Sequence, residues 1–284
     1  MSEVQSIEED HEAVGTTQWI LIASSAAVSL ILGNLAACLS GFPFYPGWQG
    51  ALVQQPWITR IAAVLAILLS AVVCGRVAGA LVGWGGRMIS VSLGLLAAGA
   101  FSIRGGTMAS VLQAAGGREV FWELAAELAV LGLVAWALFS MAGRVTGLAE
   151  GGKTRPGVSG NTLVQLLVTA GVLWVLGRSY DKMQAMGAVF FASMVGAIFG
   201  SDRWKGAWCI PLVVGMVGYI GNALSGSGLE TADLRGWAGP LAMPLPLDYL
   251  AMGPLGAALG MLVFHLDAEE DEDTATTPVR RKAV

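Results

Sequence analysis

The strongest constraint on this 284-residue chain is a series of eight apolar segments, each long enough to cross a lipid bilayer. A transmembrane helix needs about 20 mainly apolar residues. Within each segment the apolar residues are continuous rather than alternating, so each is expected to be a helix, because lipid leaves unpaired backbone N–H and C=O groups without partners. The predicted spans lie near residues 17–40, 57–82, 87–103, 120–142, 161–178, 183–200, 207–224 and 247–266.

These segments predict an all-α, polytopic helical membrane protein with about eight transmembrane helices. Composition agrees, because only 13% of residues are charged and the mean hydropathy is +0.66, whereas soluble domains carry about 25% charged residues. Seven spans is the alternative count. The joints at residues 83–86 and 179–182 are short, so two neighbouring segments at either joint can also be read as one.

The chain divides into three regions. Residues 1–16 form an acidic N-terminal tail, residues 17–266 the transmembrane helical domain, and residues 267–284 a polar C-terminal tail that we expect to be disordered. The acidic tails account for the net charge of −4 and argue against nucleic-acid binding. No Lys or Arg precedes the first span, so we expect that span to remain as an anchor rather than to be cleaved as a signal peptide.

Lys and Arg side chains predict the orientation, because basic loops tend to remain in the cytoplasm. With both termini cytoplasmic, ten of the 16 basic residues fall inside and six outside. The loops at residues 42–57 and 225–246, rich in Pro, Gly and aromatic residues, then lie outside. We therefore expect a multi-pass protein of a prokaryotic inner (plasma) membrane.

Few residues have the chemistry of a cofactor or catalytic site. The two histidines, His11 and His265, are too few for a typical haem or metal site, and the three cysteines occur singly in apolar segments. The chain has no phosphate-binding glycine loop, HExxH motif or dinucleotide fingerprint. We therefore expect no cofactor and no metal, and an enzyme is the least favoured class.

Small residues recur at four-residue spacing, which places them on one helix face. Such faces allow close helix packing in membranes. The glycines that we assign to helix packing are Gly75, Gly79, Gly83, Gly196, Gly200, Gly256 and Gly260.

The clearest polar feature is a stripe of glutamates, Glu119, Glu123 and Glu127, at the start of the fourth span. Glu127 lies about two turns inside the span, where a carboxylate must be paired, neutralised or wet. One hypothesis is an ion pair with Arg60 or Arg104, which are predicted at the same level. The other is a pathway for an ion or a substrate, lined by Glu123 and Glu127.

Two asparagines extend this second hypothesis. Asn34 and Asn222 fall in the outer halves of their spans. Each side chain can hydrogen-bond a neighbouring helix, or both can line a polar outer vestibule with Glu127. The apolar stretch at residues 107–115 is expected to lie in the interface or to re-enter over this vestibule.

The sequence therefore predicts a transporter or permease-like component with a polar outer vestibule near Glu127. The alternative is a non-catalytic structural or assembly subunit of a membrane complex. The predicted partner is the lipid bilayer, and the sequence leaves open association into a homo-oligomer or with membrane-complex subunits. The substrate is not specified by any motif.

Overall fold

The computed structural model describes residues 16–40, 51–79, 83–104, 106–115, 119–145, 160–200, 207–225 and 238–276. Regular structure throughout these residues is helical. Long helices occupy the positions of all eight apolar segments: α1 (Thr16–Leu39), α2 (Trp57–Gly79), α3 (Gly83–Arg104), α5 (Glu119–Val145), α6 (Gly160–Leu176), α7 (Lys182–Gly200), α9 (Ile210–Leu224) and α11 (Pro246–Thr276). Three short elements lie between them: η1 (Leu52–Gln54), α4 (Met108–Ala115) and α10 (Gly239–Ala242).

Four or five of the described helices are long and apolar enough to cross a membrane. The four are parts of α1, α2, α5 and α7, namely Ile20–Leu39, Trp57–Cys74, Glu119–Met141 and Lys182–Gly200. A fifth is the pair formed by α3 and α4, which bend by 58° at the break between them. The apolar parts of α6 and α9 are shorter. An all-helical fold with several helices able to cross a membrane is thus confirmed for the described residues, and the count of about eight crossings stays a prediction.

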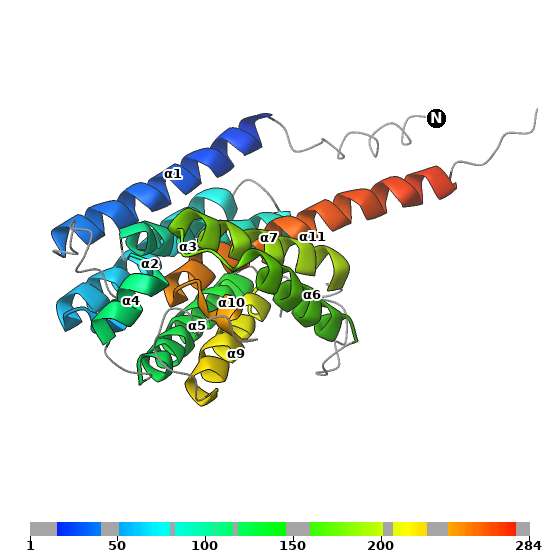
Figure 1. Ribbon diagram of the computed structural model, residues 1–284. Coiled ribbons are helices and arrows are strands. Elements are labelled where there is room, and N and C mark those ends of the chain that lie inside the picture. The colour runs from blue at the N-terminus through cyan, green and yellow to red at the C-terminus, as the bar shows by residue number, and fades with distance from the viewer. Residues whose placement is uncertain are drawn as a thin grey trace, which may run out of the picture.

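Helix α11 is the centre of the bundle, because it contacts α3, α5, α7 and α9. Helix α1 packs on α2 and α3 and lies along one edge (Figure 1). Large apolar side chains on outward faces are exposed, among them Ile31, Leu65 and Leu133. Lipid rather than water suits such surfaces.

Glycines set the spacing of α7 against its two neighbours. A Cβ atom at Gly256 would overlap the carbonyl oxygen of Phe190, and one at Gly260 would overlap that of Met194. Helices α7 and α11 therefore approach backbone to backbone, which increases their dispersion contacts.

The same arrangement recurs on the other side of α7. A Cβ atom at Gly196 would overlap Thr169 Oγ1, and one at Gly200 would overlap Gln165, both on α6. Of the other glycines assigned to packing, Gly75, Gly79 and Gly83 lie in described helical backbone, but their contacts lie outside the described residues.

Two boundaries differ from the sequence predictions. Residues 225–246 were expected to form an outer loop, yet residues 238–245 are all buried within the bundle. The predicted tail begins at residue 267, whereas the backbone of α11 is helical to Thr276. Ala, Glu and Asp residues in that acidic segment are compatible with a continuing helix, Ala and Glu being strong helix formers.

Candidate functional site

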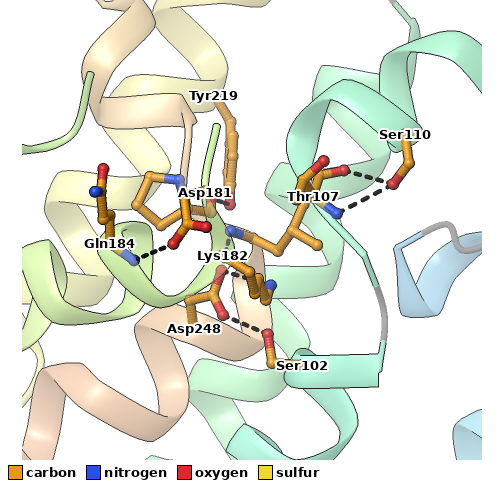
Figure 2. Close-up of polar contacts among 10 residues, drawn as sticks. Ser102, Thr107, Ser110, Asp181, Lys182, Gln184, Tyr219 and Asp248 are labelled. Atoms are coloured by element: carbon orange, nitrogen blue, oxygen red, sulfur yellow. Dashed lines mark hydrogen bonds and ion pairs between the residues drawn. The ribbon is translucent and has the colours of Figure 1, made fainter. Parts of the chain in front are cut away.

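A buried ion pair connects α7 to α11. Asp248 has no exposed surface, and its carboxylate accepts a hydrogen bond from Lys182 Nζ at 2.8 Å, from the backbone N of Leu245 at 2.7 Å, and from Ser102 Oγ. The Lys182 side chain is 13% exposed. Figure 2 shows these side chains converging from three helices, α3, α7 and α11. We call Ser102, Lys182 and Asp248 the Asp248 site.

The start of α11 explains the position of Asp248. Leu245 is the residue before the helix, Pro246 is its first residue, and Asp248 is its third. A carboxylate at this third position reaches back to the N–H of the residue before the helix, as in the capping box. The positive end of the helix dipole also favours a negative charge there. The local sequence at the start of α11 therefore determines the position of the carboxylate, independently of its contact with Lys182.

Lys182 is held by the start of its own helix. Asp181, the residue before α7, accepts a hydrogen bond from Gln184 N at 3.0 Å, which is the usual N-cap interaction. Ser179 Oγ in turn accepts one from Asp181 N at 3.0 Å. Because this cap fixes the first turn of α7, Lys182 is the first helical residue and its side chain points into the bundle toward Asp248 (Figure 2).

Two buried tyrosines hold the backbone beside the Asp248 site. Tyr219 OH donates to Pro244 O, and Tyr249 OH donates to Leu241 O. The two rings pack edge to face with centroids 6.3 Å apart. The carbonyl group of Leu241 in α10 and that of Pro244 in the break between α10 and α11 therefore find side-chain partners, as buried backbone outside a continuous helix requires.

Glycines on α6 and α9 make room for this break. A Cβ atom at Gly218 of α9 would lie 2.6 Å from Leu241 C, and one at Gly177, just after α6, would lie 2.6 Å from Pro240 O. A Cβ atom at Gly215 would lie 2.7 Å from the ring of Tyr249. Residues 238–245, which we call the α10 segment, thus pack directly on the backbone of two helices.

Glu127 is the second buried carboxylate in this region. It is 9% exposed, and it lies close enough to Lys182 and to Tyr219 to interact with both electrostatically. The Asp248 site and Glu127 lie toward the same end of the bundle, because α5, α7 and α11 begin there while α3 and α9 end there. Glu127 lies about 12 Å along α5 from Glu119.

The other predicted pathway residues are separated by the structure. Glu123 is exposed on α5, one turn before Glu127. Asn222 is buried, and its Nδ2 donates to Gly218 O at 2.8 Å within its own helix. Asn34 is exposed on α1, a helix that packs on α2 and α3. The structure therefore brings Glu127 and Asn222 to neighbouring helices and leaves Asn34 apart from them.

The two arginines proposed as partners of Glu127 make other contacts. Arg60 Nε donates to Gln55 O at 2.8 Å, and Arg104 Nη2 donates to Cys38 Sγ at 3.2 Å. Neither contact involves Glu127, which has Lys182 as a cationic neighbour. Pairing of Glu127 with either arginine stays a prediction.

Lys182 and Asp248 were not selected from the sequence. The orientation predicted from the basic residues places Lys182 on the outer side, among the six outer Lys and Arg residues, and Asp248 lies next to the predicted start of the last span. One signal was present: Asp248 is an acidic residue inside the first turn of an apolar helix and follows a Pro at the first helical position. That pattern predicts a helix start, but it does not predict which cation the carboxylate meets.

What the site can do follows from its groups. A carboxylate, an ammonium group and a second carboxylate within an apolar bundle can exchange protons or bind a small cation. Within the described residues no three His, Cys, Asp or Glu side chains gather as metal ligands. Comparison with protein-family models, with characterised proteins and with solved structures found no match to this chain.

Proposed function

We propose that the protein is a proton-translocating transporter or permease-like component of a prokaryotic plasma membrane, and that Glu127, Lys182 and Asp248 form its charge-carrying site. The observation that supports it best is the buried Lys182–Asp248 ion pair with Glu127 as a further acidic neighbour. Ionisable groups inside a membrane bundle are costly and often mark ion pathways.

The charge balance of this group favours a proton as the ion. Glu127 and Asp248 carry two formal negative charges, and Lys182 carries one positive charge. An ion pair that only fixes the order of helices needs two charged groups. A third group that gains and loses a proton changes the net charge of the site by one unit. The carboxylate of Asp248 already accepts a hydrogen bond from Lys182. We therefore assign proton uptake to Glu127.

The proposal includes about eight membrane crossings with both termini in the cytoplasm. In that arrangement the Asp248 site and Glu127 lie toward the outer side, and α3, α6, α9 and α11 cross in addition to the four helices that are long and apolar enough. Support comes from the ten-to-six distribution of basic residues.

The test is proton flux into liposomes that contain the purified protein and a luminal pH dye. A potassium diffusion potential, negative inside, drives protons inward. We expect the parent protein to acidify the lumen faster than empty liposomes, and we expect Glu127→Gln to reduce the rate to that of empty liposomes. Glu119→Gln is the matched control, because Glu119 is exposed at the start of the same helix and its loss should leave the flux unchanged.

Two results would count against this function. A parent protein that acidifies no faster than empty liposomes does not translocate protons. Equal loss of flux in Glu119→Gln and Glu127→Gln would show that the effect is not specific to the buried carboxylate.

A second candidate is a non-catalytic structural or assembly subunit of a membrane complex. Support for it comes from the three hydrogen bonds that Asp248 accepts from α3, α7 and the start of α11. A carboxylate whose donors come from several helices fixes their relative positions. Absent flux together with strong stability coupling between Lys182 and Asp248 would favour this candidate.

A further inference from the structure

We propose that the α10 segment, residues 238–245, is a gate at the end of the bundle that holds the Asp248 site, and that the Lys182–Asp248 ion pair keeps it closed. The role of the gate in proton translocation rests on the proposed function. The evidence for the gate is the way in which this segment is held.

The contacts of the α10 segment differ from those of a continuous helix. All eight of its residues are buried, and only Gly239–Ala242 form a helix. Three side-chain hydrogen bonds hold its backbone: Tyr219 OH to Pro244 O, Tyr249 OH to Leu241 O, and Leu245 N to Asp248 Oδ2. Discontinuous helices of this kind accompany binding sites in many transporters.

The segment packs closely on its neighbours, both by backbone against glycine and by the buried side chains of Leu241, Met243 and Leu245. Gly177 and Gly218 accept the backbone at Pro240 and Leu241 without a side chain between them. The backbone contacts at these two glycines need no side chain to be withdrawn, whereas Leu241, Met243 and Leu245 are buried in the core and lose apolar contacts when the segment moves. Movement of the α10 segment would therefore break its side-chain hydrogen bonds and expose these three side chains, so the closed position is stable unless a contact that holds it is lost.

Asp248 connects the gate to the rest of the bundle. Its Oδ2 atom accepts from Leu245 N, the last residue of the α10 segment, and also from Lys182 Nζ on α7. Loss of the ion pair removes the bond to α7 but keeps the one to Leu245. The hydrogen bond that Asp248 accepts from Ser102 on α3 also remains. The gate and the first turn of α11 are then held less firmly against α7.

The test is the rate at which a water-soluble maleimide modifies a cysteine in the gate of the full-length protein in liposomes. Cys38, Cys74 and Cys209 are first replaced by alanine. The reporter is Met243→Cys, since Met243 is buried in the gate, and the control is Met261→Cys, since Met261 is buried on α11 far from the site. Both substitutions reduce the size of the side chain, so neither overfills its position.

Each reporter is combined with Lys182→Met plus Asp248→Asn, which removes both charges. The asparagine side chain retains an acceptor for Leu245 N, and neutral replacement of a buried ion pair is often tolerated. We expect modification at position 243 to accelerate by about tenfold or more, because a local opening becomes easier, while position 261 keeps its parent rate.

An unchanged rate at position 243 would overturn the proposal. Equal acceleration at both positions would mean that the double variant loosens the whole bundle, and Tyr219→Phe then decides. That change removes one hydrogen bond to the gate and should accelerate position 243 alone; if it does not, the gate is refuted. Proton flux is not measured here, so the gate can fail while proton translocation stands, and the reverse.

Discussion

Asp248 has two roles in the molecule. Its Oδ2 atom accepts from Leu245 N, which caps α11, and from Lys182 Nζ, which joins α11 to α7. The first bond joins residues that are close in sequence. The second joins two residues that are 66 positions apart, so it depends on the packing of α7 against α11. A substitution at Asp248 is therefore expected to affect both the helix start and the helix pair, while one at Lys182 affects only the pair.

We predict strong coupling between these two residues. Lys182→Met should lower the free energy of unfolding by about 3–5 kcal/mol, because it leaves the Asp248 carboxylate buried without its ammonium partner. Adding Asp248→Asn should restore part of the loss, since no uncompensated charge then remains. The measurement is a double-mutant cycle on chemical unfolding in detergent. Additive effects of the two substitutions would contradict a net contribution from the ion pair.

At this scale the sequence predicts burial better than partnership. The depth of Glu127 follows from its place two turns inside an apolar segment, and the structure buries it. The chain sequence does not indicate which cation lies beside Glu127. The prediction of Arg60 and Arg104 as its partners therefore rests only on their expected depth in the membrane. The sequence does not indicate a buried role for Lys182, because a charged residue at the first position of a helix is usually exposed to solvent. In the structure its long side chain points into the bundle instead (Figure 2).

At the scale of helices and loops, the sequence again predicts some features and does not predict others. Each of the eight apolar segments contains a helix, because continuous apolar runs in lipid must satisfy their backbone groups internally. The sequence predicts an outer loop at the α10 segment, since Pro240, Pro244 and Pro246 interrupt the apolar pattern. Its burial depends on Gly177 and Gly218, which lie on other helices, and no local pattern reports such a contact.

Glycine substitutions test the packing of the α10 segment. Gly218→Ala would place a Cβ atom 2.6 Å from Leu241 C, so the segment must shift. We expect a loss of about 1–3 kcal/mol in unfolding free energy, as for other overpacked contacts. The thermal midpoint in detergent is the measurement.

Gly171→Ala is the matched control for that substitution. Gly171 is exposed on α6 and a Cβ atom there meets nothing within 4 Å. Alanine should leave stability unchanged or raise it by up to about 1 kcal/mol, since it favours the helix. Equal behaviour of the two variants would mean that the α10 segment does not pack as closely on α9 as the structure has it.

For the whole molecule the open quantity is the number of membrane crossings. Helices α6 and α9 have 17 and 15 residues, which correspond to about 25 Å and about 22 Å of helix. A hydrocarbon core is about 30 Å thick, so these two helices span it only if the bilayer thins or the flanking residues extend the apolar length. Their contacts with α7 and with each other favour crossing.

The side of the membrane on which Ser225 lies decides between the counts. Ser225 is exposed at the end of α9. With eight crossings and a cytoplasmic N-terminus, Ser225 lies outside and Val284 inside. If only α1, α2, α5 and α7 cross, both positions lie inside, and if the α3–α4 pair crosses as well, both lie outside. We predict the first arrangement, because it agrees with the excess of Lys and Arg assigned to the cytoplasm.

The measurement is modification of Ser225→Cys and Val284→Cys by a membrane-impermeant maleimide in intact bacterial cells, with the native cysteines replaced. Cysteine at position 225 should react in intact cells, and cysteine at position 284 only after permeabilisation. Protection of both positions until permeabilisation would support four crossings and place the ends of α6 and α9 away from the outer surface. Reaction of both in intact cells would show an odd number of crossings, and the Asp248 site could then no longer be assigned to the outer side from the basic residues.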